Sequence, residues 1–270
     1  MVRSELSDTP AIINPALHIA NSLNDPYLRN IVKADFIGAL IQSHKKDRAL
    51  ELLEDILREL PQVESDSQKT DILCTIATTF AKIKIPEAEQ LLDRIISVTE
   101  HIADPYYLVE VYIHSVASLS CNDQPEKAKV LFSETLEKLK EIKPVKKRLM
   151  SLCKWPMIFS GILLKLEPDT IDKLKGIPEE FTGDHKIRAY RCIAELLLRI
   201  GQIDVAEKLS ELITKDEEKN AFLRELAKTL IDRNEYTHAV QVIETISNEN
   251  DKASVLRKWA QRIISPREEE

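Results

Sequence analysis

The chain has 270 residues, a net charge of −7 at pH 7 and only five glycines. This length exceeds the usual size of one compact core, so it predicts either two domains or an elongated structure built from repeats. The acidic balance argues against general attraction to nucleic-acid phosphates or anionic lipid, and no apolar run is long enough to cross a bilayer. We therefore expect a cytoplasmic protein with no nucleic-acid partner and no membrane insertion.

The first predicted helices are marked by a repeated start signal. Residues 1–24 hold a lone apolar pattern, ALHIANSL, which we interpret as an N-terminal cap or partial repeat. The sequences NDPYLRN at 24–30 and ADPYYLV at 103–109 then place an Asp directly before a Pro. Asp can cap a helix and Pro suits its first turn, so both mark helix starts. We expect three long helix-turn-helix units over residues 25–142.

Small residues recur in pairs along the chain, eleven or twelve positions apart. The pairs are Gly38 and Ala49, Ala77 and Ala88, Ala117 and Ala128, Ala194 and Ala206, and Ala227 and Ala239. Each pair encloses a polar turn such as RIGQID, in which Gly201 can take the left-handed conformation that ends a helix. Because small side chains let two helix backbones approach closely, each pair predicts an antiparallel helical hairpin.

One segment departs from this pattern. Residues 143–183 place Pro156 inside an apolar helical run, which predicts a kink or break near Trp155 and a short second helix. Residues 184–264 return to the pattern with two units and a C-terminal capping helix, and residues 265–270 form an acidic tail.

The unit resembles a tetratricopeptide repeat, a helix-turn-helix of about 34 residues with one small residue on each helix. Ala194 with Ala206, and Ala227 with Ala239, match its two small-residue positions, and Gly201 fits its turn. The resemblance implies an all-α fold, a right-handed α-solenoid of antiparallel helix-turn-helix (TPR-like) repeats. HEAT-like helical hairpins are the neighbouring alternative.

The sequence contains little that points to catalysis. The cysteines, at 74, 121, 153 and 192, are widely separated, and we interpret them as single core residues with no redox or metal role. No HExxH pair, phosphate-binding glycine loop or catalytic triad pattern is present. We therefore expect no enzyme activity, no catalytic residue, no metal and no cofactor.

The resemblance also implies that the first helix of each repeat lines a concave groove. In that register Arg191, Arg224 and Arg257 fall at one repeat position, 33 residues apart, and Lys228 lies one turn beyond Arg224. Guanidinium groups suit carboxylates or phosphates, so these four residues are candidate partner-binding residues. In the alternative interpretation the arginines pair with Glu195, Glu218 or Glu225 and act as struts between repeats.

A second basic patch lies within residues 138–154. Its members are Lys143, Lys146, Lys147, Arg148 and Lys154. They could dock an acidic protein segment, although such a run is more often a solvated helix end.

These features, with the resemblance, favour a non-catalytic protein–protein interaction scaffold or adaptor that binds an acidic peptide or helix in the concave groove. One alternative is a peptide- or ligand-responsive regulator that changes superhelical shape to control a partner. An enzyme or an RNA-binding helical repeat is the third reading.

Overall fold

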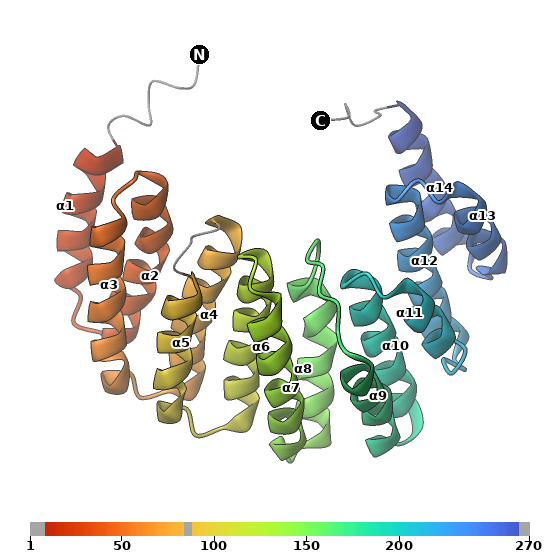
Figure 1. Cartoon of the computed structure of the whole chain (residues 1–270), viewed down its shortest axis with the longest axis horizontal. Helices are drawn as coiled ribbons and strands as arrows, with labels where there is room; N and C mark the ends of the chain where they lie inside the picture. The colour runs from red at the N-terminus through yellow and green to blue at the C-terminus, as the bar shows by residue number, and fades with distance from the viewer. Residues whose placement is uncertain (1–8, 84–87, 265–270) are drawn as a thin grey trace. The chain divides into compact units, whose positions relative to one another are not determined.

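The computed structural model describes residues 9–83 and 88–264, and over these ranges it contains helices and no strand (Figure 1). The chain divides into two compact units, Met1–Ser151 and Leu152–Glu270. The division falls inside one helix, α8 (Val145–Ile158).

The first unit consists of consecutive helical hairpins. Its helices are α1 (Thr9–Asn21), α2 (Pro26–Gln42), α3 (Lys46–Glu59), α4 (Asp66–Ile83), α5 (Ala88–Ser97), α6 (Pro105–Cys121) and α7 (Pro125–Glu141). Short 3₁₀ turns, η2 (Leu60–Gln62) and η3 (Val98–His101), extend α3 and α5. The first helices α2, α4 and α6 pack against one another in series, and α3, α5 and α7 pack beside them.

The two DPY sequences begin helices α2 and α6, as predicted. One carboxylate oxygen of Asp25 accepts hydrogen bonds from the backbone N–H groups of Tyr27 and Leu28, at 2.7 and 3.2 Å. Asp104 accepts one from the N–H of Tyr106 at 2.9 Å. Each aspartate thus satisfies N–H groups that the first turn of a helix leaves without a partner.

Four hairpin turns share one backbone conformation. Each contains a residue with positive φ, namely His44 (58°), Asp123 (59°), Gly201 (91°) and Asn234 (62°). The N–H of the residue that follows donates to a carbonyl oxygen five positions earlier, at 2.8 to 3.0 Å. This is the Schellman ending of a helix, and it reverses the chain tightly enough for the second helix to fold back. The turn between α4 and α5 lies outside the described residues.

The second unit repeats the hairpin arrangement after an irregular start. After α8 its helices are α9 (Pro168–Gly176), η4 (Ile177–Glu180), α10 (Gly183–Arg199), α11 (Ile203–Ser210), α12 (Asp216–Asp232), α13 (Tyr236–Thr245) and α14 (Glu249–Ile264). Helix α10 packs against α11 and α12, and α12 packs against α13 and α14.

The small residues lie where helices pack closely. Ala194, Ala206, Ala227 and Ala239 are fully buried. At Gly38 an added Cβ would lie 3.0 Å from Cγ2 of Thr79 on the neighbouring first helix, so a larger residue would force the two helices apart. The prediction of an all-α fold of stacked TPR-like hairpins is therefore confirmed within each unit.

Two expectations are corrected. Helix α8 continues through Trp155 and Pro156 and ends at Ile158, so the helix does not break at Trp155, and the kink at Pro156 stays a prediction. Pro156 lies in the last turn of α8, and the helix ends two residues after it.

The second correction concerns the cysteines. Cys153 on α8 and Cys192 on α10 form a disulfide, with Cα atoms 5.0 Å apart, so the interpretation of all four cysteines as single thiols is wrong for this pair. The two residues are 39 positions apart, and only the packing of α8 on α10 brings them together. Cys74 and Cys121 are half-buried.

Candidate functional site

The predicted arginine ladder is largely engaged inside the second unit. Arg191 on α10 pairs with Glu195 on its own helix at 2.8 Å and with Glu218 on α12 at 2.5 Å. Arg224 on α12 pairs with Asp251 on α14, also at 2.5 Å. Each arginine thus joins its helix to the next first helix, as the strut interpretation describes.

Glu225 collects three cations on the same face. Its carboxylate oxygens lie 2.8 Å from Nη2 of Arg199, 3.2 Å from Nε of Arg224 and 3.2 Å from Nζ of Lys228. Burial by itself raises the pKa of Glu225, but the surrounding cations outweigh burial and lower it below the ordinary value. All three cations therefore share one carboxylate of the chain itself.

Glu195 shows the opposite balance. Burial raises the pKa of its carboxyl above the ordinary value, and the attraction of Arg191 offsets this only in part. Glu225 on the neighbouring helix adds to the increase by repulsion. The face formed by α10 and α12 therefore holds one carboxylate that is strained by burial next to one that is well compensated.

Arg257 differs from the other two arginines. It is exposed on α14 and makes no ion pair with any other residue that the structure describes. An acidic ligand could approach Arg257 directly, whereas at Arg191, Arg224 and Lys228 it would have to displace carboxylates of the chain itself.

The second basic patch is divided between the two units. Lys143 and Lys146 are exposed in the first unit. Lys147 is fixed there, because its Nζ lies 3.1 Å from Oδ2 of Asp104 and over the rings of Tyr106 and Tyr107. Arg148 belongs to the first unit and Lys154 to the second, and both are half-buried. Lys147 is thus bound to the start of helix α6.

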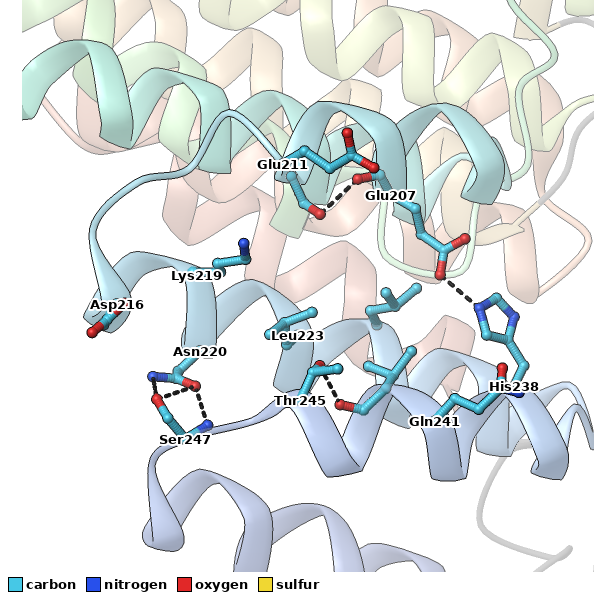
Figure 2. Close-up of a pocket in the computed structure, with 13 residues that line it drawn as sticks. Glu207, Glu211, Asp216, Lys219, Asn220, Leu223, His238, Gln241, Thr245 and Ser247 are labelled. Carbon is cyan, nitrogen blue, oxygen red and sulfur yellow. Dashed lines mark hydrogen bonds and ion pairs between the residues drawn. The ribbon is translucent and has the colours of Figure 1, made fainter.

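A groove that sequence analysis did not predict lies between α11 and α13, over α12 (Figure 2). It has a volume of about 660 Å³. Apolar side chains line it from α12 and α13, namely Leu223, Leu226 and Val242. Around them stand polar side chains from all three helices, among them Glu207, Glu211, Asp216, Lys219 and Gln241.

Side-chain contacts lie at both ends of this groove (Figure 2). At one end Nε2 of His238 lies 2.7 Å from Oε1 of Glu207, which links α13 to α11. At the other end the Asn220 side chain donates to Oγ of Ser247 and accepts from the Ser247 N–H, both at 2.9 Å. The first contact joins the two wall helices, and the second joins α12 to the segment that follows α13.

The charge of the groove is acidic. Glu207, Glu211 and Asp216 contribute three carboxylates, and Lys219 is the one lysine or arginine among the lining residues. A groove with an apolar floor and an excess of carboxylates suits a peptide segment that presents an apolar side chain next to a cationic one.

A smaller hollow occupies the equivalent place in the first unit. It lies between α5 and α7, over α6, and has a volume of about 390 Å³. Leu119, Val130 and Leu131 form its apolar part, and Glu126 and Glu134 stand at its edge. A hollow between successive second helices is thus a recurring product of this hairpin packing.

Sequence reasoning missed the groove because its residues come from three helices. The resemblance to a tetratricopeptide repeat points to residues of the first helices, whereas the groove is lined by polar residues of the second helices α11 and α13. The spacing of those polar residues is the signal in the sequence that could have located it. No group of three or more His, Cys, Asp or Glu side chains in the described ranges is arranged to hold a metal ion.

Comparison with known proteins yields distant structural neighbours. No protein-family model matches the chain, and no curated protein matches it. One similar solved structure is Ton1535 from Thermococcus onnurineus NA1, 15% identical, with a TM-score of 0.38 over 94% of this chain and 85% of that one.

Another is a Podospora anserina protein described as a kinesin light chain with nearly identical TPR-like repeats. It is 14% identical, with a TM-score of 0.39, and the match covers 75% of this chain and 98% of that one. The functional argument therefore rests on the residues of this chain. Among its described helices, none combines the length and apolar character needed to span a bilayer.

Proposed function

We propose that the protein is a non-catalytic interaction scaffold that binds a peptide segment of a partner protein in the groove between α11 and α13. The observation that carries this proposal is the groove itself, which has an apolar floor, an acidic rim and two walls joined by the Glu207–His238 contact. Binding sites of this kind combine apolar contact area with a few polar groups that fix orientation.

The segment is expected to carry a lysine or arginine beside an apolar residue. Its cation would approach Glu211 and Asp216, which are exposed, and its apolar side chain would cover Leu223. This differs from the acidic ligand expected from the sequence, because Arg191, Arg224 and Lys228, three of the four cations expected to receive that ligand, are paired with carboxylates of the chain.

The first-helix face, which carries Arg191, Arg224, Lys228 and Arg257, supports a second, weaker site for an acidic segment. This site is centred on Arg257. Its exposure on α14 is the observation that favours it. Binding at this face would depend on Arg257 and on displacement of the Arg224–Asp251 pair.

Selection of peptides from a displayed library on the immobilised protein tests the proposal. We expect selected sequences to share a basic residue next to an apolar one and to bind with saturable fluorescence anisotropy. Glu211→Arg should weaken binding at least about tenfold, because it reverses a charge on the rim.

Glu134→Arg is the matched control, since it reverses an exposed carboxylate at the hollow of the first unit. It should leave binding to the second unit unchanged. Equal binding by the Glu211→Arg variant and the wild type would contradict the groove as the site, and a selected motif that is acidic and sensitive to Arg257→Glu would favour the first-helix face.

A further inference from the structure

Helix α14 carries the same apolar register as the first helix before it. In α12 the register consists of Phe222, Leu223, Leu226, Ala227, Leu230 and Ile231. Exactly one repeat length later, 33 residues along the chain, α14 has Val255, Leu256, Trp259, Ala260, Ile263 and Ile264. The amino-acid pattern of α14 is therefore that of a helix covered on the same sides as α12.

The burial of the two registers differs sharply. In α12 every one of these side chains is buried, because α10, α13 and α14 all pack against this helix. In α14 only Val255 is buried, whereas Leu256, Ile263 and Ile264 are 47%, 70% and 79% exposed. Exposed apolar side chains that share one face of a helix form a candidate interaction surface.

This face continues onto the adjacent second helix. The ring of Tyr236 on α13 stacks on Trp259, with centroids 5.8 Å apart and planes 3° from parallel. Tyr236 and Val240, one turn apart on α13, are 40% and 38% exposed. The apolar face thus spans α14 and the side of α13 that carries Tyr236 and Val240. We call it the α14 face and define it by Leu256, Ile263, Ile264, Tyr236 and Val240.

The hairpins that precede α14 show what shape fits such a face. On α12 the covering element is α13, an amphipathic helix with Ala239 fully buried and with Val242 and Ile243 also directed inward. A helix that covers the α14 face in the same way needs a small residue at the closest approach and large apolar residues one turn on.

The charge around the α14 face specifies the occupant further. Helix α14 has four basic residues, Lys252, Arg257, Lys258 and Arg262, against two acidic ones, Glu249 and Asp251. Lys258 is paired with Asp232, but Arg257 is exposed beside the apolar residues. A second copy of this chain would bring like charges together, whereas a helix with acidic flanks would meet them favourably.

We propose that the α14 face docks an amphipathic helix of a partner protein, with one apolar side and acidic flanks, in the position that α13 holds on α12. This site lies apart from the groove between α11 and α13, and it stands whether or not that groove binds a peptide.

Two synthetic helical peptides of about 16 residues test the proposal, a length at which helix formation on a surface is practicable. Both carry one apolar stripe with an alanine at the position of Ala239 in α13. One has glutamate on its flanks and the other has lysine. Fluorescence anisotropy with the full chain should show saturable binding of the glutamate peptide, and at least about fivefold weaker binding of the lysine peptide at low salt.

The double variant Leu256→Asp, Ile263→Asp should weaken binding of the glutamate peptide at least tenfold. Both side chains are exposed, so the thermal unfolding midpoint should change little. Val130→Asp, which replaces a side chain that is 61% exposed on α7, is the matched control and should bind as the wild type does.

Three results would overturn the proposal. The first is the absence of saturable binding by either peptide up to about 1 mM, which corresponds to a binding free energy weaker than about −4 kcal/mol. The second is unchanged binding by the double variant. The third is concentration-dependent dimerisation of the wild type in sedimentation velocity that the double variant abolishes, because a second copy would then be the occupant.

Discussion

Gly201 gives the sharpest test of the hairpin turn. Its φ of +91° is a conformation that residues with a Cβ rarely adopt, so Gly201→Ala must either keep a strained backbone or disturb the turn between α10 and α11. Left-handed backbone costs an L-residue about 1–2 kcal/mol. The new Cβ would also lie 3.1 Å from Cδ2 of Leu163, but that side chain is exposed and can move, so the steric contribution is small.

We therefore expect Gly201→Ala to lower the free energy of unfolding of the second unit by about 1–2 kcal/mol. Asn234 holds the same position in the next turn, at φ 62°, and provides a matched pair of controls. Asn234→Gly keeps the left-handed conformation accessible and should change stability by less than about 0.5 kcal/mol, whereas Asn234→Ala should cost about as much as Gly201→Ala.

Urea denaturation followed by far-ultraviolet circular dichroism measures these differences. Because the chain has two compact units, each transition should be fitted separately. A Gly201→Ala variant that unfolds within about 0.3 kcal/mol of the wild type would refute the reasoning, and so would a loss of stability in Asn234→Gly as large as in Asn234→Ala.

Two further predictions concern buried features of the second unit. Burial raises the pKa of Glu195, so its proton is bound more tightly in the folded state and its charge costs stability above that pKa. Glu195→Gln should therefore stabilise the protein at pH 7, and the gain should vanish below the unfolded pKa, near pH 4, in urea titrations at both pH values; a gain that grows on acidification would contradict the sign. Reduction of the Cys153–Cys192 disulfide with dithiothreitol should lower the unfolding free energy by about 2–4 kcal/mol, because it frees a long loop in the unfolded chain. The unfolding free energy of the Cys153→Ser variant should be the same with and without dithiothreitol. A wild-type unfolding transition that dithiothreitol leaves unchanged would count against the disulfide.

The disulfide also bears on where the protein is stable. Disulfides persist mainly in oxidising compartments, and a reducing cytoplasm would hold Cys153 and Cys192 as thiols. In a cytoplasmic setting the second unit would then be stabilised by its non-covalent contacts, including the packing of the fully buried Trp155 and Phe159.

The local parts of this fold were readable from the sequence. Asp25 and Asp104 cap helices because a carboxylate next to Pro can reach the N–H groups of the same turn. Gly201 and Asn234 end helices because their own backbone can take positive φ. Ala194 and Ala206 mark a close helix crossing because their side chains add almost no bulk. All these effects act within a few residues, and they determine where each hairpin begins, turns and packs.

The candidate sites were decided by tertiary packing. Arg191 and Arg224 each lie 27 residues from the carboxylate on the next first helix, and the sequence offered several glutamates as equal alternatives. Only the distance between neighbouring helices selects the pair. The groove between α11 and α13 likewise depends on the spacing that the His238–Glu207 contact holds.

Helix α14 shows most clearly which properties the sequence determines and which depend on tertiary packing. The spacing of its apolar residues is visible in the sequence. That spacing is the same whether another helix packs against the apolar face or the face is exposed to solvent. The sequence determined that α14 has the chemistry of an inner helix, since side-chain periodicity is a local property. The tertiary structure decided that Leu256, Ile263 and Ile264 remain exposed, because burial depends on which segments of the chain pack against that face.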